Sequence, residues 1–353
     1  MASPEAITPQ NLRIVDASLN RTAEGLRYLE DVSRFILNDA LLTRRLKSLR
    51  RELITSEFPF QKQLMESRDA AGDVGITGRK PEKTEVRDLP TSIIANARRG
   101  QEALRTLEEF SKVVTFSPSL TSQKLEQARF ELYTIEKEML GRLLRKDKTE
   151  SIRGVYVIID MQSLKGRDHV EVTRQVIQGG ARVIQLRDKT LDRGQLLPIA
   201  MEMQQVCAEN NALFIVNDYT DLVLAVRADG VHLGQTDLPV SIVRKLIPLD
   251  ILIGCSVYNA EQAVKAAEDG ADYVAVGAIY QTPSKESVVV GLDVLRKVKT
   301  AVSLPVVAIG GINLENIAEV REAGADAVSV ISAVLGAKSP ETATRKLMKK
   351  FGK

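Results

Sequence analysis

Eight short apolar runs in the second part of the chain constrain its fold more than any other feature. They lie at 154–160, 181–189, 213–218, 230–234, 251–257, 273–279, 305–312 and 327–334. Helical segments separate them, and several of these segments open with a helix-capping residue, namely Asp192, Asn259, Asn313 and Ser339. Eight strand–helix units in about 200 residues match a compact (β/α)8 TIM barrel. A doubly wound sheet is the alternative, but polar residues end nearly every run, which favours strands arranged around one mouth.

Two neighbouring runs are each followed by an aspartate. Asp218 ends the run at 213–218, and Asp237 follows the run at 230–234. Active sites of parallel α/β folds lie at the carboxyl ends of the strands, so both carboxylates are expected to face one pocket. Two such hard oxygen ligands suit Mg²⁺ bound together with substrate phosphates. The alternative is that each aspartate merely caps the helix that follows it.

Other strand ends carry groups that suit an anion. Strand alternation puts Gln185, Arg187 and Lys189 on one side of the second run. Because unpaired buried cations would be costly, these side chains predict an anion site. The fifth run ends near Ser256, and Asn217 precedes Asp218.

Phosphate-binding groups are expected after the last three runs. The loop YQTPSK follows the sixth run and offers Thr282, Ser284 and Lys285, although a turn around a proline would look the same. The seventh run ends in Gly310 and Gly311, and the eighth contains Ile331 and Ser332. Backbone N–H groups after the seventh and eighth strands form the usual phosphate cradle of barrels of this type.

The first half of the chain is a duplication of a helix pair. Residues 20–35 align with 98–113, so that Glu24, Leu26, Arg27, Leu29, Glu30 and Ser33 recur as Glu102, Leu104, Arg105, Leu107, Glu108 and Ser111. The partner helices, 46–53 and 125–132, also match. Apolar spacing predicts the first two helices at 11–37 and 41–58. An all-α bundle whose halves face each other about a pseudo-twofold axis is expected, with the repeated leucines in its core.

Two polar segments lie between and after the helix pairs of this half. The stretch 67–75, SRDAAGDVG, lies between the repeats and makes a plausible loop for phosphate and metal. The repeated Arg–Glu pairs have a plainer interpretation as a solvated, salt-bridged helix face. The charged stretch 145–153 is expected to link two domains, at 1–147 and 148–353.

Composition narrows the chemistry. With only Cys207 and Cys255, neither a disulfide framework nor a thiolate metal site is expected, and a reducing cytoplasmic location fits. The net charge of +3 is spread without a basic block, which argues against nucleic acid as a partner. The sequence contains no apolar run near the length of a membrane span, and its start lacks the features of a signal peptide. Its two histidines exclude chemistry based on a histidine cluster, whereas phosphate chemistry needs none.

Taken in order, seven motifs of the second half identify a resemblance. They are QLRDK, VND, GVHLGQTD, GCS, YQTPSK, AIGGI and VSVISAV, and with them residues 153–350 resemble the thiamine-phosphate synthase (thiamine-phosphate pyrophosphorylase) family. Departures are Asp188 where Glu is common, Ser284 where Thr is common, and Tyr258 where His is common. The rival interpretation is another phosphate-binding barrel enzyme, such as an isomerase, but no matching acid–base pair stands at the strand ends.

The resemblance implies an activity and a set of roles. Hydroxymethylpyrimidine diphosphate and thiazole phosphate would condense to thiamine phosphate and pyrophosphate. Asp218 and Asp237 would hold Mg²⁺ on the diphosphate. Arg187, Lys189, Asn217 and Lys285 would neutralise it, and Ser256 would act with them in catalysis. Gln185 and Ser256 would lie near the pyrimidine, while the thiazole phosphate would be held by Thr282, Ser284, Gly310, Gly311, Ile331 and Ser332.

The first half resembles the small helical hydroxymethylpyrimidine-phosphate kinase domain. The resemblance rests on NRTAEGLRYLEDVSRF, SRDAAGDVG and ANARRGQEALRTLEEF, between residues 11 and 145. It implies ATP as a substrate and phosphate and Mg²⁺ contacts by Arg21, Arg27, Arg68, Asp69, Asp73, Arg98, Arg99 and Arg105. Duplicated helix pairs are also common dimerisation elements, so the alternative is a non-catalytic assembly or regulatory module within a homo-oligomer.

Overall fold

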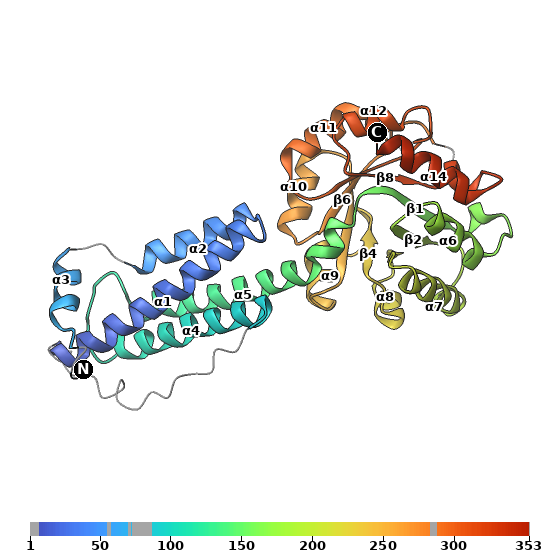
Figure 1. Cartoon of the computed structure of the whole chain (residues 1–353). Helices are drawn as coiled ribbons and strands as arrows, with labels where there is room; N and C mark the ends of the chain where they lie inside the picture. Colours follow the sequence, from blue (N-terminus) through green and yellow to red (C-terminus); the bar gives the residue numbers. More distant parts are fainter. Residues whose placement is uncertain (1–6, 55–57, 70–71, 73–86, 283–287, 353) are drawn as a thin grey trace. The chain divides into compact units, whose positions relative to one another are not determined.

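The chain folds into two compact units, Met1–Leu143 and Leu144–Lys353 (Figure 1). The structure is a computed structural model, and it describes residues 7–54, 58–69, 72, 87–282 and 288–352. The predicted order, an all-α bundle followed by a TIM barrel, is confirmed. The domain boundary predicted between residues 147 and 148 falls inside one continuous helix and stays a prediction.

Five helices make up the first unit, and the last of them, α5, continues into the second unit. They are α1 Pro9–Phe35, α2 Ala40–Leu53, α3 Phe58–Glu66, α4 Leu89–Ser111 and α5 Ser122–Glu150. The side chains of Thr8, Asp39 and Asp88 cap α1, α2 and α4. The second helix had been predicted to run to residue 58, but it ends at Leu53, because the backbone of Ile54 leaves the helical region. The separate helix α3 was not predicted.

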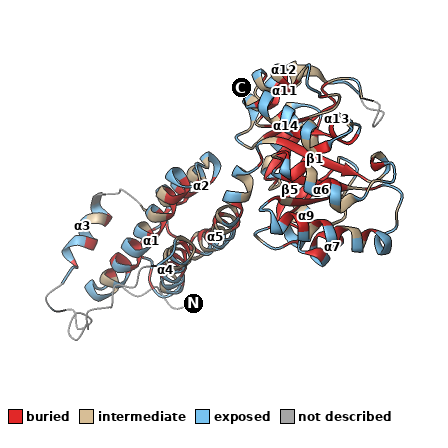
Figure 2. Cartoon of the chain, turned by 45° about the vertical axis from the view of Figure 1, so that its right-hand side comes forward, coloured by how far each residue is buried: buried red, intermediate tan, exposed pale blue. Residues whose placement is uncertain are grey.

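The repeated leucines form the core of the bundle. Leu26 and Leu29 of α1 and their counterparts Leu104 and Leu107 of α4 are fully buried, as predicted. Helix α1 packs against both α2 and α4. Buried residues therefore line the inner faces of the helices, and exposed residues cover their outer faces (Figure 2).

Eight parallel strands close into a barrel in chain order. They are β1 Gly154–Asp160, β2 Val183–Arg187, β3 Leu213–Asn217, β4 Gly230–Leu233, β5 Leu252–Val257, β6 Tyr273–Val276, β7 Val306–Ile309 and β8 Ala327–Val330. Between and after them lie η1 Gln162–Leu164, α6 His169–Gln178, α7 Arg193–Glu209, α8 Thr220–Val226, α9 Val240–Leu246, α10 Ala260–Glu268, α11 Gly291–Ala301, α12 Ile317–Glu322, α13 Ser332–Leu335 and α14 Pro340–Phe351.

The strand predictions are correct in number and place but too long at several ends. The eighth run had been predicted as strand to residue 334, whereas the strand stops at Val330 and residues from Ser332 form α13. A short apolar run fits a buried helix as well as a strand, so its pattern alone does not mark the change. Asp192, Asn259 and Ser339 cap helices as predicted, but the N-cap of α12 is Asn316 and not Asn313.

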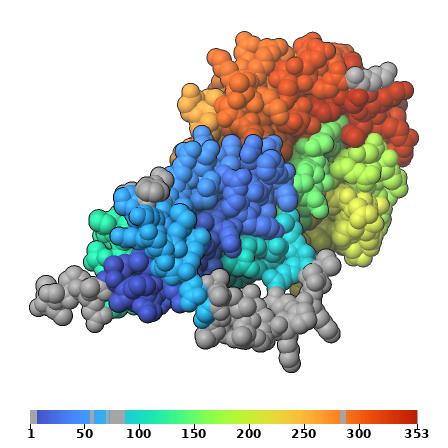
Figure 3. All heavy atoms as spheres, turned by 60° about the vertical axis from the view of Figure 1, so that its left-hand side comes forward, coloured from blue at the N-terminus to red at the C-terminus, as the bar shows by residue number. Residues whose placement is uncertain are grey.

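Strand alternation divides the barrel unit into two apolar layers. On β1, Val155, Val157 and Ile159 belong to the layer between strands and helices, and Tyr156 and Ile158 to the layer inside the barrel. The helices surround the strands (Figure 1), and the space-filling view shows closely packed atoms on the face that it presents (Figure 3). The barrel is thus a packed core whose open end holds the polar strand termini.

Residues 145–150 of the charged stretch predicted as a linker form the end of α5, and the role of the stretch as a linker stays a prediction. Its Arg145 is buried and its Nε donates to Asp272 Oδ1 at 2.7 Å. Lys148 forms an ion pair with Asp229 at 3.0 Å. The stretch is poor in apolar residues because its basic side chains meet carboxylates of the barrel unit, and not because it is an unstructured connection.

Candidate active site

A cavity of about 170 Å³ lies where the strands end. The predicted residues that line it are Gln185, Arg187, Asn217, Ser256, Thr282, Gly310, Gly311, Ile331 and Ser332. The predicted Ser284 and Lys285 lie outside the residues that the structure describes. The barrel therefore brings together, from six strands and their loops, groups that are far apart in the sequence.

The two cations of β2 each have a carboxylate partner. Arg187 forms an ion pair with Asp160, and Lys189 forms one with Asp218. The prediction of an anion site rested on the cost of leaving these cations unpaired, and that premise is wrong. Asp160 was missed, although it ends β1 just as Asp218 follows β3, and it also accepts hydrogen bonds from the N–H and hydroxyl of Ser163.

Neither aspartate of the predicted metal pair caps a helix. The N-cap position of α8 is Tyr219 and that of α9 is Pro239, and neither has a capping side chain. Asp218 has a left-handed backbone, with φ of 64°, and its N–H donates to the carbonyl of His232 at 2.9 Å. Left-handed backbone at a residue other than glycine is strained and concentrates at functional sites. The capping alternative is therefore wrong for both residues.

Asp218 lies close enough to Asp237 to influence the protonation of the Asp237 carboxyl. Burial, and then the neighbouring Asp218 carboxyl, raise the pKa of Asp237 above its ordinary value, whereas Lys189 opposes the rise. Adjacent carboxylates of this kind fit a divalent cation, which would relieve their repulsion. Among the described residues, no third His, Cys, Asp or Glu joins them. A Mg²⁺ ion here would thus need oxygens from its substrate and from water, as is usual for that ion.

The loop after β7 brings backbone close to the cavity. Gly311 has φ of 65°, and a Cβ at this position would lie 2.4 Å from the carbonyl oxygen of Gln281. Only glycine fits both the conformation and the space. Gly310, Gly311, Ile331 and Ser332 line the same cavity as Thr282.

Ser256 is held from two directions. Its hydroxyl is 3.0 Å from Nε2 of His232, and its carbonyl accepts a hydrogen bond from the Gln235 amide at 2.6 Å. His232 is buried at the end of β4, and it also lines the cavity, as does Tyr258.

The repeated charges of the helical unit are paired within their own repeat. Glu30 is buried and contacts Arg27 at 3.7 Å and Arg50 at 3.0 Å. Its counterpart Glu108 contacts Arg105 at 2.6 Å and Arg129 at 3.0 Å. The same ion-pair arrangement thus occurs twice, which accounts for the repetition of these residues without a ligand.

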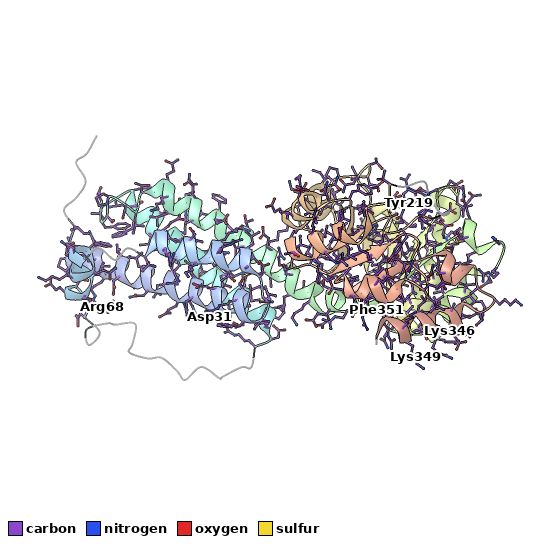
Figure 4. All side chains as sticks on the ribbon, turned by 90° about the horizontal axis from the view of Figure 1, so that it is seen from above. Asp31, Arg68, Tyr219, Lys346, Lys349 and Phe351 are labelled. Atoms are coloured by element: carbon purple, nitrogen blue, oxygen red, sulfur yellow. The ribbon has the colours of Figure 1, made fainter. Side chains whose placement is uncertain are left out.

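The predicted kinase residues fall at different levels of the bundle. Arg68 donates two hydrogen bonds to Asp16, at 2.8 and 2.9 Å, and Asp69 contacts Arg13. Arg27 follows Asp16 by eleven residues on α1, about 16 Å along a helix at 1.5 Å per residue. Figure 4 accordingly shows Arg68 well away from Asp31, to which Arg27 is also paired.

The remaining members of that set are exposed or undescribed. Arg21 on α1 and Arg98 and Arg99 on α4 are exposed, and Arg99 donates to Asn96 at 3.3 Å. Asp73 lies outside the described residues. The structure therefore does not gather the predicted kinase residues into one cluster.

A closed parallel barrel with polar groups at the carboxyl ends of its strands defines a (β/α)8-barrel enzyme. The family profile described as thiamine monophosphate synthase matches residues 155–334, and that of the ThiD2 family matches residues 13–138. Proteins named thiamine-phosphate synthase from Nostoc punctiforme and Synechocystis sp. are each 37% identical. They align over 97% and 98% of this chain and 94% and 97% of their own lengths.

One solved structure gives the same result for the barrel. The thiamine phosphate pyrophosphorylase from Pyrococcus furiosus superposes with a TM-score of 0.53 at 40% identity, over 57% of this chain and 97% of its own. The chain belongs to the thiamine-phosphate synthase family, with a ThiD2-family domain in its first half. Over the described part of the chain, no helix is both long and apolar enough to cross a bilayer.

Proposed function

We propose that the barrel condenses hydroxymethylpyrimidine diphosphate with thiazole phosphate, giving thiamine phosphate and pyrophosphate. The observation that carries this proposal is the cavity at the strand ends. Arg187 lines it together with a glycine turn suited to a second phosphate. Lys189, Asp218 and Asp237 do not line the cavity itself, but they follow β2, β3 and β4 at the same end of the barrel, where Lys189 pairs with Asp218. Two separate phosphate-binding regions at one cavity are what a reaction between two phosphorylated substrates requires.

The reaction asks for charge stabilisation more than for a strong base. The bond between the pyrimidine methylene carbon and the diphosphate oxygen breaks, and the electron pair leaves with pyrophosphate. The aminopyrimidine stabilises the resulting cation, and the thiazole nitrogen lone pair forms the new C–N bond. Arg187, Lys189, Asn217 and Lys285 would stabilise the leaving group. A Mg²⁺ ion held by Asp218 and Asp237 would supply further charge neutralisation.

The other residues have binding roles in this proposal. Gln185 and Ser256 would contact the pyrimidine. Thr282, Ser284, Gly310, Gly311, Ile331 and Ser332 would hold the thiazole phosphate, with backbone N–H groups among the donors. Holding both substrates in line lowers the barrier by removing the need to bring them together during the reaction.

The proposal is tested by supplying the full chain with both substrates and Mg²⁺ and measuring thiamine phosphate. Ser256→Ala should lower turnover and leave the Mg²⁺ concentration at half-maximal rate unchanged. A wild-type chain that consumes neither substrate would overturn the assignment. If the Ser256→Ala variant needs more Mg²⁺ than the wild type, Ser256 would instead be assigned to the metal site.

We propose in addition that the helical unit phosphorylates hydroxymethylpyrimidine phosphate to its diphosphate. The match of residues 13–138 to the ThiD2 family favours this second activity. An oxygen of the substrate phosphate would attack the γ-phosphorus of ATP, and ADP would leave. Arg68 and Asp69, which meet Arg13 and Asp16 beside the segment between the repeats, are the residues favoured to hold the phosphates.

The test is ATP-dependent diphosphate formation by the full chain. Arg68→Ala is expected to abolish it, with circular dichroism as the folding control. Lys47→Ala, a change of an exposed cation on α2, serves as the matched control. If the wild-type chain forms no diphosphate, the unit is an assembly or regulatory module.

A further inference from the structure

A chain of buried hydrogen bonds crosses the barrel interior and joins two residues of the cavity. The Gln185 amide nitrogen donates to the Tyr156 hydroxyl at 2.7 Å, and that hydroxyl lies 3.0 Å from the hydroxyl of Tyr273. The Tyr273 hydroxyl lies 3.1 Å from Nδ1 of His232. The other imidazole nitrogen, Nε2, lies 3.0 Å from the hydroxyl of Ser256. The two ends of the chain, Gln185 and Ser256, both line the cavity.

A single glycine, Gly254, leaves the space that this chain of hydrogen bonds needs. In the parallel register, His232 of β4 pairs with Gly254 of β5, which in turn pairs with Tyr273 of β6. A Cβ on Gly254 would lie 2.1 Å from Cζ of Tyr273. The missing side chain therefore lets the tyrosine ring reach across β5 to the imidazole, and the ring centroids lie 5.6 Å apart.

Each central link holds one proton. Burial raises the pKa values of Tyr156 and Tyr273, so both keep their O–H at neutral pH. The His232 ring meets a hydroxyl at each nitrogen, and a neutral imidazole has a single N–H to give to one of them. Every hydroxyl and ring in the chain can then donate in one direction only.

The Gln185 amide sets that direction. Because its nitrogen donates to Tyr156, the Tyr156 O–H is left to donate to Tyr273, and the Tyr273 O–H to donate to Nδ1 of His232. The imidazole proton must then sit on Nε2 and point at the Ser256 oxygen. Ser256 keeps its own proton for a ligand. Among the described residues, Gln185 makes its hydrogen bond through nitrogen, which leaves the amide oxygen as an acceptor.

We propose that Tyr156, Tyr273 and His232 are positioning residues, which fix Gln185 as an acceptor and Ser256 as a donor toward the substrate. This rests on the proposed synthase function, in which these two residues contact the aminopyrimidine. An aminopyrimidine presents an N–H donor on its amino group beside an acceptor on the ring nitrogen. The Gln185 acceptor complements the amino group, and the Ser256 donor complements the ring nitrogen. If both polarities were reversed, a donor would face a donor at one end and an acceptor would face an acceptor at the other.

The donor-to-acceptor direction of these hydrogen bonds can be measured by NMR on full-length protein labelled with ¹⁵N-histidine. The sequence contains two histidines, and His169→Gln assigns the remaining signals to His232. The expected result is a neutral ring protonated at Nε2, with Nδ1 shifted as a hydrogen-bond acceptor. Tyr273→Phe removes the donor to Nδ1 and should change the Nδ1 shift. A wild-type His232 protonated at Nδ1, or charged at neutral pH, would overturn the proposal.

Kinetics give a second readout that a merely structural role would not produce. Tyr273→Phe should raise the KM for the pyrimidine diphosphate by roughly three- to tenfold, the usual effect of one neutral hydrogen bond, and leave the KM for thiazole phosphate unchanged. Tyr28→Phe, which removes a tyrosine hydrogen bond to Ser92 in the helical unit, is the matched control. Equal changes in both KM values, or no change in either, would contradict the positioning role. A wild-type chain without synthase activity would refute the proposed function, whereas the NMR result would still decide the direction of the chain.

Discussion

The two units use charge in opposite ways. In the helical unit, each buried glutamate meets arginines from its own repeat, so that opposite charges are matched locally and the arrangement occurs twice. At the mouth of the barrel, Asp218 and Asp237 follow neighbouring strands, and burial together with the Asp218 carboxyl raises the pKa of Asp237. Matched charges indicate stability, whereas like charges held together at a strand end indicate a ligand.

The largest expected effect breaks the proposed metal pair. Asp218→Asn and Asp237→Asn should each lower the rate of thiamine phosphate formation by about 10²–10³, since each removes a proposed ligand of the Mg²⁺ ion that would stabilise the charge of the leaving group. Both variants should also need more Mg²⁺. Asp221→Asn, an exposed aspartate on α8, is the control and should keep wild-type kinetics. If both variants keep the wild-type rate and Mg²⁺ dependence, Asp218 and Asp237 do not hold the metal.

The next effect concerns stability and not activity. Glu108→Gln leaves Arg129 without its carboxylate in a mostly buried position, and should lower the free energy of unfolding of the helical unit by about 3 kcal/mol. Chemical denaturation followed by circular dichroism measures it. Glu102→Gln, an exposed glutamate on the same helix, should change little. Equal stability of the two variants would mean that the repeated ion pairs are not structural.

The smallest expected effect is a gain in stability, and it depends on pH. The folded-state pKa of Asp237 is raised, so the folded chain binds this proton more tightly, and stability falls as pH rises from the unfolded pKa through the folded one. Without metal at pH 7, Asp237→Asn should therefore raise the free energy of unfolding, by less than about 1 kcal/mol because solvent screens this site. Thermal unfolding with a chelator checks this, and the gain should vanish in acid. A variant less stable than wild type in chelator would show that the carboxylates do not repel each other.

Much of the barrel follows from local pattern. Eight apolar runs with polar ends were enough to place the strands, the mouth and the Asp218–Asp237 pair, because strand ends of a parallel barrel converge by construction. Strand ends such as the one before Ser332 were misplaced, because an apolar run does not show where its backbone turns helical.

Contacts between residues on different strands or helices could not be predicted from the sequence. The Arg187–Asp160 pair and the approach of Tyr273 to His232 depend on barrel closure and register. In the bundle, the partners Arg50 and Arg129 come from second helices that are set by tertiary packing, so the repeated arginines looked available for a ligand.

One assay tests directly whether the two units hold separate activities. The full chain receives hydroxymethylpyrimidine phosphate, ATP, thiazole phosphate and Mg²⁺, and both diphosphate and thiamine phosphate are followed. Asp218→Asn should accumulate the diphosphate and make almost no thiamine phosphate. Arg68→Ala should make none from the monophosphate, yet convert supplied diphosphate at the wild-type rate. Loss of both activities in either variant would contradict two independent sites.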